Sequence, residues 1–287
     1  MMPVKIEILE NEEVGYNITV IGIGKKGKEA IRKYPYPAYG GFHWGIHTLT
    51  LCDDDAFRHK KTPETTIIPD DSPHYLEKCR RKIFDIIEQT EILFVIADMD
   101  EDSNYENAFK IAKYHKNKKT EKRHSILVNC SPNTSLLDTE IFNTFDHTIY
   151  TYNANKIYRP VEMLITDMYT QWIGIDIDDV KRTLSDVPSL NFIEDEASDE
   201  NEFKEMIDHI VEEVNNKKGK DDLFNALLYV SSQSTIIYHL NEAWNSLSET
   251  AINGEFIVQA GVNSGENDNK IYISLMYGKK KMIDSAS

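Results

Sequence analysis

The sequence predicts an α/β protein: a Rossmann-like, mostly parallel sheet covered by helices, then a long central helix and a smaller α+β domain. An apolar, β-branched run turns on three glycines and enters a helical pattern over residues 18–30. Further apolar runs alternate with segments of helical period, as in sheets built from βαβ units. From about residue 174 this order changes. We therefore expect a nucleotide-binding-type domain over residues 1–153, a central helix over 154–173 and a C-terminal domain over 174–287.

Hydrophobic periodicity predicts the individual strands and helices. Strands are expected at 18–23, 46–51, 92–97, 125–129, 148–152, 190–193, 226–230, 255–262 and 270–277. Helices are expected directly after the glycines and at 76–87, 103–112, 155–173, 203–214 and 236–247. Residues 57–74 are expected to form a loop, and the residues after 193 an acidic loop.

Composition excludes several classes of protein. Of 287 residues, 40% are hydrophobic and 28% charged, which is typical of a globular domain with a large core. The net charge of −16 makes nucleic acid and anionic membranes poor partners. No apolar run is long enough to cross a membrane, and the N-terminus lacks a signal-peptide core. Three widely spaced cysteines, at positions 52, 79 and 130, form no metal motif, so we expect a reducing, cytoplasmic location.

The three glycines form a Gly-x-Gly-x-x-Gly turn between a strand and a helix. Gly22, Gly24 and Gly27 would let the backbone approach a phosphate at the helix N-terminus, with Lys25 and Lys26 beside it. The same spacing also occurs as a tight βα turn in α/β domains that bind no nucleotide. An acidic residue at the end of the second strand, Asp53, would suit a dinucleotide-dependent oxidoreductase.

Taken in order, these motifs resemble those of the FtsZ/tubulin superfamily over nearly the whole chain. The glycine turn is similar to the first phosphate loop of FtsZ, with lysines in two of the glycine places and Glu29 in the asparagine place. The helix expected at 155–173 resembles the central helix of the family. His239–Ala243 is similar to the Glu-Val-Asn-Glu-Ala of the family's last helix, and the final two strands resemble its closing strands.

The resemblance also implies site residues in the second half. Residues 174–181 are similar to the catalytic loop Asn-x-Asp-x-x-Asp-Val-Lys, with Gly174 in the asparagine place. This implies that Asp176 and Asp179 hold the catalytic-loop positions, although both could equally be capping residues at the start of a helix. Asn153 and Asn155 lie near where the family reads the guanine base, although both could equally be helix-capping residues.

One departure from the family pattern bears on activity. Where the family carries Gly-Gly-Gly-Thr-Gly-Thr-Gly around the GTP phosphates, residues 98–104 read Asp-Met-Asp-Glu-Asp-Ser-Asn. A unit charge about 5 Å from another costs roughly 3 kcal/mol at an effective dielectric near 20. A helix N-terminus offers an anion only about 0.3–1 kcal/mol in return. We therefore expect GTP or GDP binding to be weak and GTPase activity weak or absent.

The acidic stretch has other possible roles. Asp98, Asp100 and Asp102 alternate as in an EF-hand and could hold Mg²⁺ or Ca²⁺, although the sixth position is serine and the twelfth phenylalanine. A solvated acidic cap on the following helix is the alternative. The lysines of the glycine turn and Lys28 could bind phosphate or pair with these carboxylates, and we favour pairing.

The expected function is that of a divergent FtsZ-like protein that assembles or binds protein partners in cell division, cell shape or membrane remodelling. The chain ends at Ser287, soon after the last expected strand, so membrane contact is expected only through a partner. A nucleotide-binding enzyme, either a residual GTPase or an oxidoreductase, and a metal-responsive structural protein remain as alternatives.

Overall fold

The computed structural model describes most of the chain outside the first 17 residues. The described residues are 18–33, 46–52, 65–69, 83–100, 102–117, 123–131, 143–151, 157–169, 177–219, 222–232, 236–262 and 270–281.

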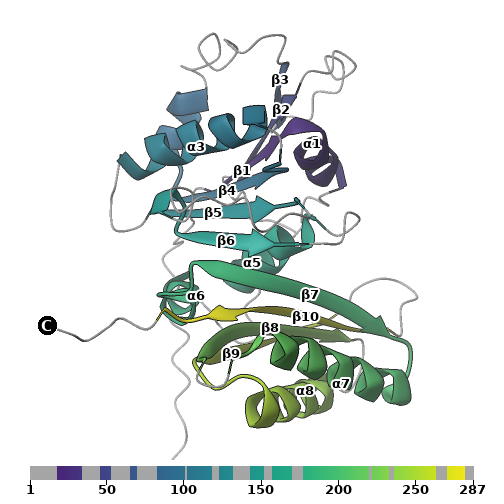
Figure 1. Cartoon of the computed structure of the whole chain (residues 1–287). Coiled ribbons are helices and arrows are strands. Elements are labelled where there is room, and N and C mark those ends of the chain that lie inside the picture. The colour runs from purple at the N-terminus through teal and green to yellow at the C-terminus, as the bar shows by residue number, and fades with distance from the viewer. Residues whose placement is uncertain are drawn as a thin grey trace, which may run out of the picture.

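A ten-stranded sheet runs through the molecule in the order β3-β2-β1-β4-β5-β6-β7-β10-β8-β9 (Figure 1). Strands β1 to β6 pair in parallel with their neighbours. These strands are β1 (Ile18–Ile23), β2 (Ile46–Cys52), β3 (Thr65–Pro69), β4 (Ile92–Ala97), β5 (His124–Asn129) and β6 (His147–Tyr150).

The second half adds a mixed sheet to the edge of the first. β10 pairs antiparallel with both β7 and β8, and β8 pairs in parallel with β9. β6 and β7 pair in parallel through three residue pairs that begin at Thr148 and Ser189, so the two sheets are continuous. The strands are β7 (Ser189–Ala197), β8 (Phe224–Ser232), β9 (Phe256–Val262) and β10 (Ile271–Lys279).

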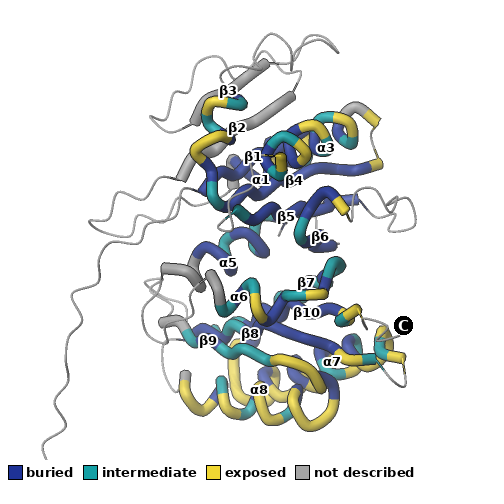
Figure 2. Tube along the Cα trace, turned by 90° about the vertical axis from the view of Figure 1, so that its left-hand side faces the viewer, coloured by how far each residue is buried: buried dark blue, intermediate teal, exposed yellow. Residues whose placement is uncertain are grey.

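Helices cover both faces of this sheet (Figure 2). One face packs in a single apolar cluster against α1 (Gly24–Lys33), α5 (Arg159–Tyr169) and α6 (Ile177–Leu184), and this cluster includes strand residues from both halves. On the other face, α3 (Asp102–Asn117) and the helical residues 83–89 cover the first half. There α7 (Glu200–Lys217) and α8 (Ile236–Thr250) cover the second half.

An ion-pair network joins α5 to the strands of the second half. The Arg159 Nε atom donates to Glu194 Oε2 on β7 at 2.6 Å, and the same oxygen accepts from Ser274 Oγ on β10 at 3.2 Å. Arg159 also pairs with Glu162 one turn further along α5. Burial alone would lower the pKa of Arg159, but the two carboxylates raise it. The central helix is therefore tied to the second half by charge as well as by apolar packing.

The predicted α/β class is confirmed, while two local predictions are wrong. Residues 65–69, expected in a loop, form the edge strand β3. β7 continues through the expected acidic loop to Ala197, because Glu194 pairs with Arg159 and Glu196 with Lys270. The central helix is described as α5, and the rest of the expected range 154–173 lies mostly outside the described residues.

Candidate functional site

The candidate site lies where the strand order reverses between β1 and β4. Open α/β sheets bind ligands at this switch point, beyond the carboxyl ends of the parallel strands. Three segments meet there: the start of α1 after β1, residues 98–100 and the start of α3 after β4, and residues 130–131 after β5. The glycine turn and the acidic stretch, predicted separately from sequence, therefore lie next to each other.

Close packing accounts for the glycines of the β1–α1 turn. A Cβ atom on Gly27 would lie 2.4 Å from the carbonyl oxygen of Ile96 on β4, and one on Gly22 would lie 2.4 Å from the carbonyl oxygen of Gly27. Gly24 begins α1 with a φ of +69°, and a Cβ there would lie 2.5 Å from Asn104 Nδ2. Only glycine suits such contacts and such a φ. All three positions thus have a structural role that does not depend on a ligand.

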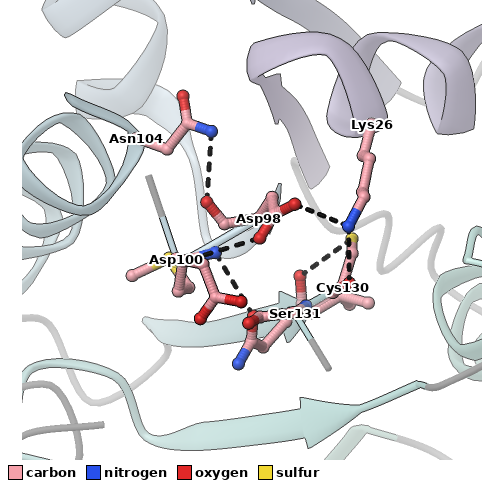
Figure 3. Close-up of polar contacts among 9 residues, drawn as sticks. Lys26, Asp98, Asp100, Asn104, Cys130 and Ser131 are labelled. Atoms are coloured by element: carbon pink, nitrogen blue, oxygen red, sulfur yellow. Dashed lines mark hydrogen bonds and ion pairs between the residues drawn. The ribbon is translucent and has the colours of Figure 1, made fainter. Parts of the chain in front are cut away.

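The acidic stretch is paired with a lysine of the glycine turn (Figure 3). Lys26 Nζ lies 2.6 Å from Asp98 Oδ2 and also donates to the carbonyl oxygen of Cys130 at 3.3 Å. The hydrogen bond to Asp98 raises the pKa of Lys26, against a smaller opposing effect of burial. The predicted pairing is confirmed for Lys26. Its ammonium group is thus already neutralised by the protein's own carboxylate.

Asn104 joins the two turns from the α3 side. Its Nδ2 atom donates to the main-chain oxygen of Asp98 at 3.1 Å, and its buried amide lies against Gly24. Asp98 Oδ1 in turn accepts from the main-chain nitrogen of Asp100 at 3.3 Å. The space between the two turns is therefore lined by the side chains of Lys26, Asp98 and Asn104 (Figure 3).

The three predicted metal ligands do not converge. Asp98 is paired with Lys26, whereas Asp100 and Asp102 are exposed. Within the described ranges, no group of three or more His, Cys, Asp or Glu side chains is placed to hold a metal ion. Binding of Mg²⁺ or Ca²⁺ at this stretch therefore stays a prediction, without a pre-formed ligand set in this part of the chain.

Asn129, at the end of β5, was not among the site residues predicted from the sequence. Its Oδ1 atom accepts from the main-chain nitrogens of Ser131 at 3.0 Å and Met99 at 3.4 Å, so it fixes both neighbouring turns. Its Nδ2 atom is buried with no hydrogen-bond partner among the described residues. Burial raises the pKa of the adjacent Cys130 to about 12, so this thiol stays protonated. A polar amide at the end of a buried strand was the available signal.

Of the other predicted site residues, the two that the structure describes do not join this site. Lys25 is exposed on α1. Asp179 accepts from Arg182 Nη2 at 2.6 Å on α6. α6 lies beside the starts of the parallel strands, at the opposite edge of the sheet (Figure 1). Asp176, Asn153, Asn155 and Asp53 lie outside the described residues.

Comparison with known proteins identifies the fold. No protein-family profile and no curated protein sequence matches the chain. A point mutant of FtsZ from M. jannaschii is similar in structure, with a TM-score of 0.69 and 15% identity over 92% of this chain and 91% of that one. An empty FtsZ dimer from M. jannaschii has a TM-score of 0.67 and 14% identity, and the match covers 96% of this chain and 95% of that one. CetZ2 from Haloferax volcanii, a GTPγS-bound protofilament, has a TM-score of 0.60 and 13% identity, and the match covers 93% of this chain and 94% of that one.

At such identities the similarity concerns the fold, which extends over nearly the full length of each protein. None of the described helices is long and apolar enough to cross a membrane. The switch-point geometry, the central helix and these structural neighbours together show that the chain has the fold of the FtsZ/tubulin superfamily.

Proposed function

We propose that this chain is an FtsZ/tubulin-like scaffold protein that acts by self-association or by binding a protein partner, with weak or no GTPase activity. The observation that carries the proposal is the Lys26–Asp98 pair at the switch point, where the turn after β1 meets the turn after β4. Cell division, cell shape or membrane remodelling, with any membrane contact made through a partner, are the processes in which such a scaffold would act.

The geometry supports the loss of GTPase activity in two ways. First, an incoming phosphate would have to displace Asp98 from Lys26 to gain the ammonium group. Second, it would approach Asp100 and Asp102 as well, and each carboxylate within about 5 Å would cost roughly 3 kcal/mol before screening. The exposure of these two side chains reduces that cost through solvent screening but leaves its sign unchanged.

The place of Asp179 supports action between molecules rather than within one. α6 lies at the opposite edge of the sheet from Lys26, so the two could share a site only if a second chain supplied one of them. Two of the structural neighbours are a dimer and a protofilament. A head-to-tail assembly that placed Asp179 beside the acidic 98–102 stretch would add a carboxylate to that stretch, which disfavours a nucleotide between subunits.

The test measures phosphate release and sedimentation on the same samples. We expect no GTP turnover above background with Mg²⁺ at high protein concentration, and a pelleted fraction that is the same without nucleotide, with GDP and with GTP. Asp179→Ala and Asp176→Ala should leave phosphate release unchanged, at the background level. Robust turnover that either substitution abolishes would overturn the proposal, because these are the catalytic positions implied by the family resemblance.

A second candidate, a protein that binds nucleotide without hydrolysing it, is favoured by one observation. Asn129 Nδ2 is a buried donor with no partner in the described part of the chain, and it lies beside the switch point. Nucleotide released by denaturing the purified protein separates the two candidates. Guanine nucleotide in near-equal amount to protein would support this second candidate, and none would support the scaffold that needs no nucleotide.

A further inference from the structure

Exposed apolar side chains gather on α8. Ile237 is 69% exposed, Tyr238 49% and Trp244 44%, and the fourth large exposed apolar residue of the described chain is Leu223 at 37%. Ile237 and Trp244 are seven residues apart, which places them on the same side of a helix two turns apart. Exposed large apolar side chains grouped on one helix are candidates for a protein-interaction surface.

The helix layer that carries this patch is strongly acidic. α7 and α8 lie side by side on one face of the second half (Figure 1). Together they carry eight carboxylates and two lysines, a net charge of −6, and α8 has no lysine or arginine. The surface therefore combines apolar anchors with an acidic surround, and its charge complements a partner that is basic and partly aromatic.

The C-terminal half of α3 has this complementary character, although the chain as a whole carries a charge of −16. Residues 110–117 contain Lys110, Lys113 and Lys116 and no carboxylate. Tyr105 and Phe109 stack one turn earlier with ring centroids 6.4 Å apart, and Lys113 Nζ lies 5.4 Å from the Phe109 centroid. The side chains of Lys110 and Lys113 are exposed, and Lys110 Nζ lies 3.1 Å from Glu106 Oε2 on the same helix.

We propose that the α7–α8 layer of one copy of this chain docks the C-terminal half of α3 of a second copy. This inference rests on the proposed self-association and assigns its contact surfaces. Within one molecule α3 packs on β1, β4 and β5, whereas α7 packs on β7 and α8 on β8 and β9. The two surfaces lie at opposite ends of the sheet (Figures 1 and 2), so they meet only between molecules.

Each copy carries both surfaces, so the contact either closes as a twofold dimer or repeats as a filament. Ile237 and Trp244 would pack against the aromatic residues of α3, in the manner of a helix that lies in an apolar groove. The lysines of α3 would face the carboxylates of α7. Because the Debye length is about 8 Å at physiological salt, repulsion between distant acidic regions is screened there, while these contact pairs still attract.

A charge swap tests the contact. In one variant Lys110→Glu is combined with Lys113→Glu, and in the other Glu205→Lys is combined with Asp208→Lys on the exposed side of α7. We expect each variant alone to lose self-association, measured by analytical ultracentrifugation at 0.15 M salt, with the apparent Kd raised about tenfold or more. An equimolar mixture of the two should regain it, because each then offers the other an opposite charge.

The matched control for the lysine variant combines Lys280→Glu with Lys281→Glu, which changes the net charge of the protein by the same amount at residues that follow the end of β10. It should associate as the wild type does. Trp244→Ala should weaken association without changing its dependence on salt, because it removes an apolar contact. Circular dichroism and thermal melting confirm that each variant is folded.

Three results overturn the inference. If the wild type associates and both charge variants associate equally well, the contact surfaces are wrong while the scaffold function stands. If the wild type and the mixture remain monomeric up to high concentration, this inference and the self-association part of the proposed function fail, while binding of a protein partner stands. If the Lys110 and Lys113 variant keeps self-association but loses binding to vesicles of phosphatidylglycerol, α3 is a membrane-binding surface instead.

Discussion

The two ends of the parallel strands, which we call the carboxyl edge and the amino edge of the sheet, differ in the charge of their ionisable side chains. At the carboxyl edge, Lys26 and Asp98 form an ion pair whose lysine side chain is 38% exposed. At the amino edge, His124 and His147 begin β5 and β6 and are buried, as is His115 at the end of α3. The carboxyl edge, which is partly exposed to water, thus carries a charged pair, whereas the buried histidines of the amino edge are neutral.

The geometry of the amino edge shows why its histidines are neutral. The rings of His124 and His147 lie 4.8 Å apart, and His147 Nδ1 lies 2.9 Å from the main-chain oxygen of Val187. Burial, with His147 next in effect, lowers the pKa of His124 to about 3. Burial also lowers the pKa of His147, and that of His115 to about 4. Burial therefore outweighs the nearby Asp146, whose Oδ2 is 3.7 Å from His124.

The largest expected effect is acid destabilisation through the amino edge. The unfolded chain takes up protons near pH 6.5, whereas folded His115 and His124 resist until about pH 4 and about pH 3. Stability is therefore greatest above pH 6.5 and falls as the pH drops through this window. Each buried histidine adds up to about 1.4 kcal/mol per pH unit to the slope. Urea unfolding at a series of pH values between 7 and 4.5 measures it.

The histidine variants separate the contributions. His124→Asn should reduce the slope, whereas His209→Asn, at an exposed position on α7, should leave it unchanged. If neither His124→Asn nor His115→Asn alters the slope of stability against pH, the histidines titrate normally in the folded protein. The contrast between the two edges would then fail.

The next effect concerns packing at the carboxyl edge. Gly27→Ala would place a methyl group 2.4 Å from the main-chain oxygen of Ile96, and neither backbone can easily move. We expect a loss of about 1–3 kcal/mol in the free energy of unfolding, as for other overpacked positions. Gly219→Ala is the control, since its nearest neighbour is the side chain of Asp222 at 2.9 Å, which can rotate. Equal losses in the two variants would contradict a packing role for the glycine turn.

A smaller effect is expected when the charge pair itself is broken. Asp98→Asn keeps the shape of the side chain but removes its charge, so the pKa of Lys26 should fall towards 10.5 and stability should drop by less than about 1 kcal/mol. GTP affinity, measured by calorimetry, should rise because Lys26 becomes available to phosphate. Glu196→Gln, which breaks the remote pair with Lys270, should leave GTP affinity unchanged. If Asp98→Asn also leaves it unchanged, the pair does not control access to this site.

The smallest effect is expected from the exposed carboxylates. Replacing Asp100 and Asp102 together with asparagine should leave stability nearly unchanged and raise GTP affinity by about threefold to tenfold, since exposed charges are strongly screened. Added salt should shrink the difference between variant and wild type. Tight GTP binding by the wild type, with no gain in the variant, would show that this stretch does not face a bound phosphate.

The sequence alone determined most of the fold. Runs such as Ile92–Ala97 are apolar throughout, which indicates strands buried on both faces, and the stripe on α7 at helical spacing is the side that packs in the core. The pairing of a lysine of the glycine turn with the acidic stretch was also predictable. Both features depend on residues close together in the chain or on simple charge complementarity.

Only the tertiary structure decided the remainder, because those features depend on partners distant in sequence. β3 forms because β2 offers it a free edge, and β7 continues to Ala197 because β10 and Arg159 pair with its acidic residues. Asn129 matters because strand order brings the turn after β4 beside the turn after β5. The neutral histidines of the amino edge depend on a burial that neighbours in the chain cannot produce, since the covering atoms come from other strands and helices.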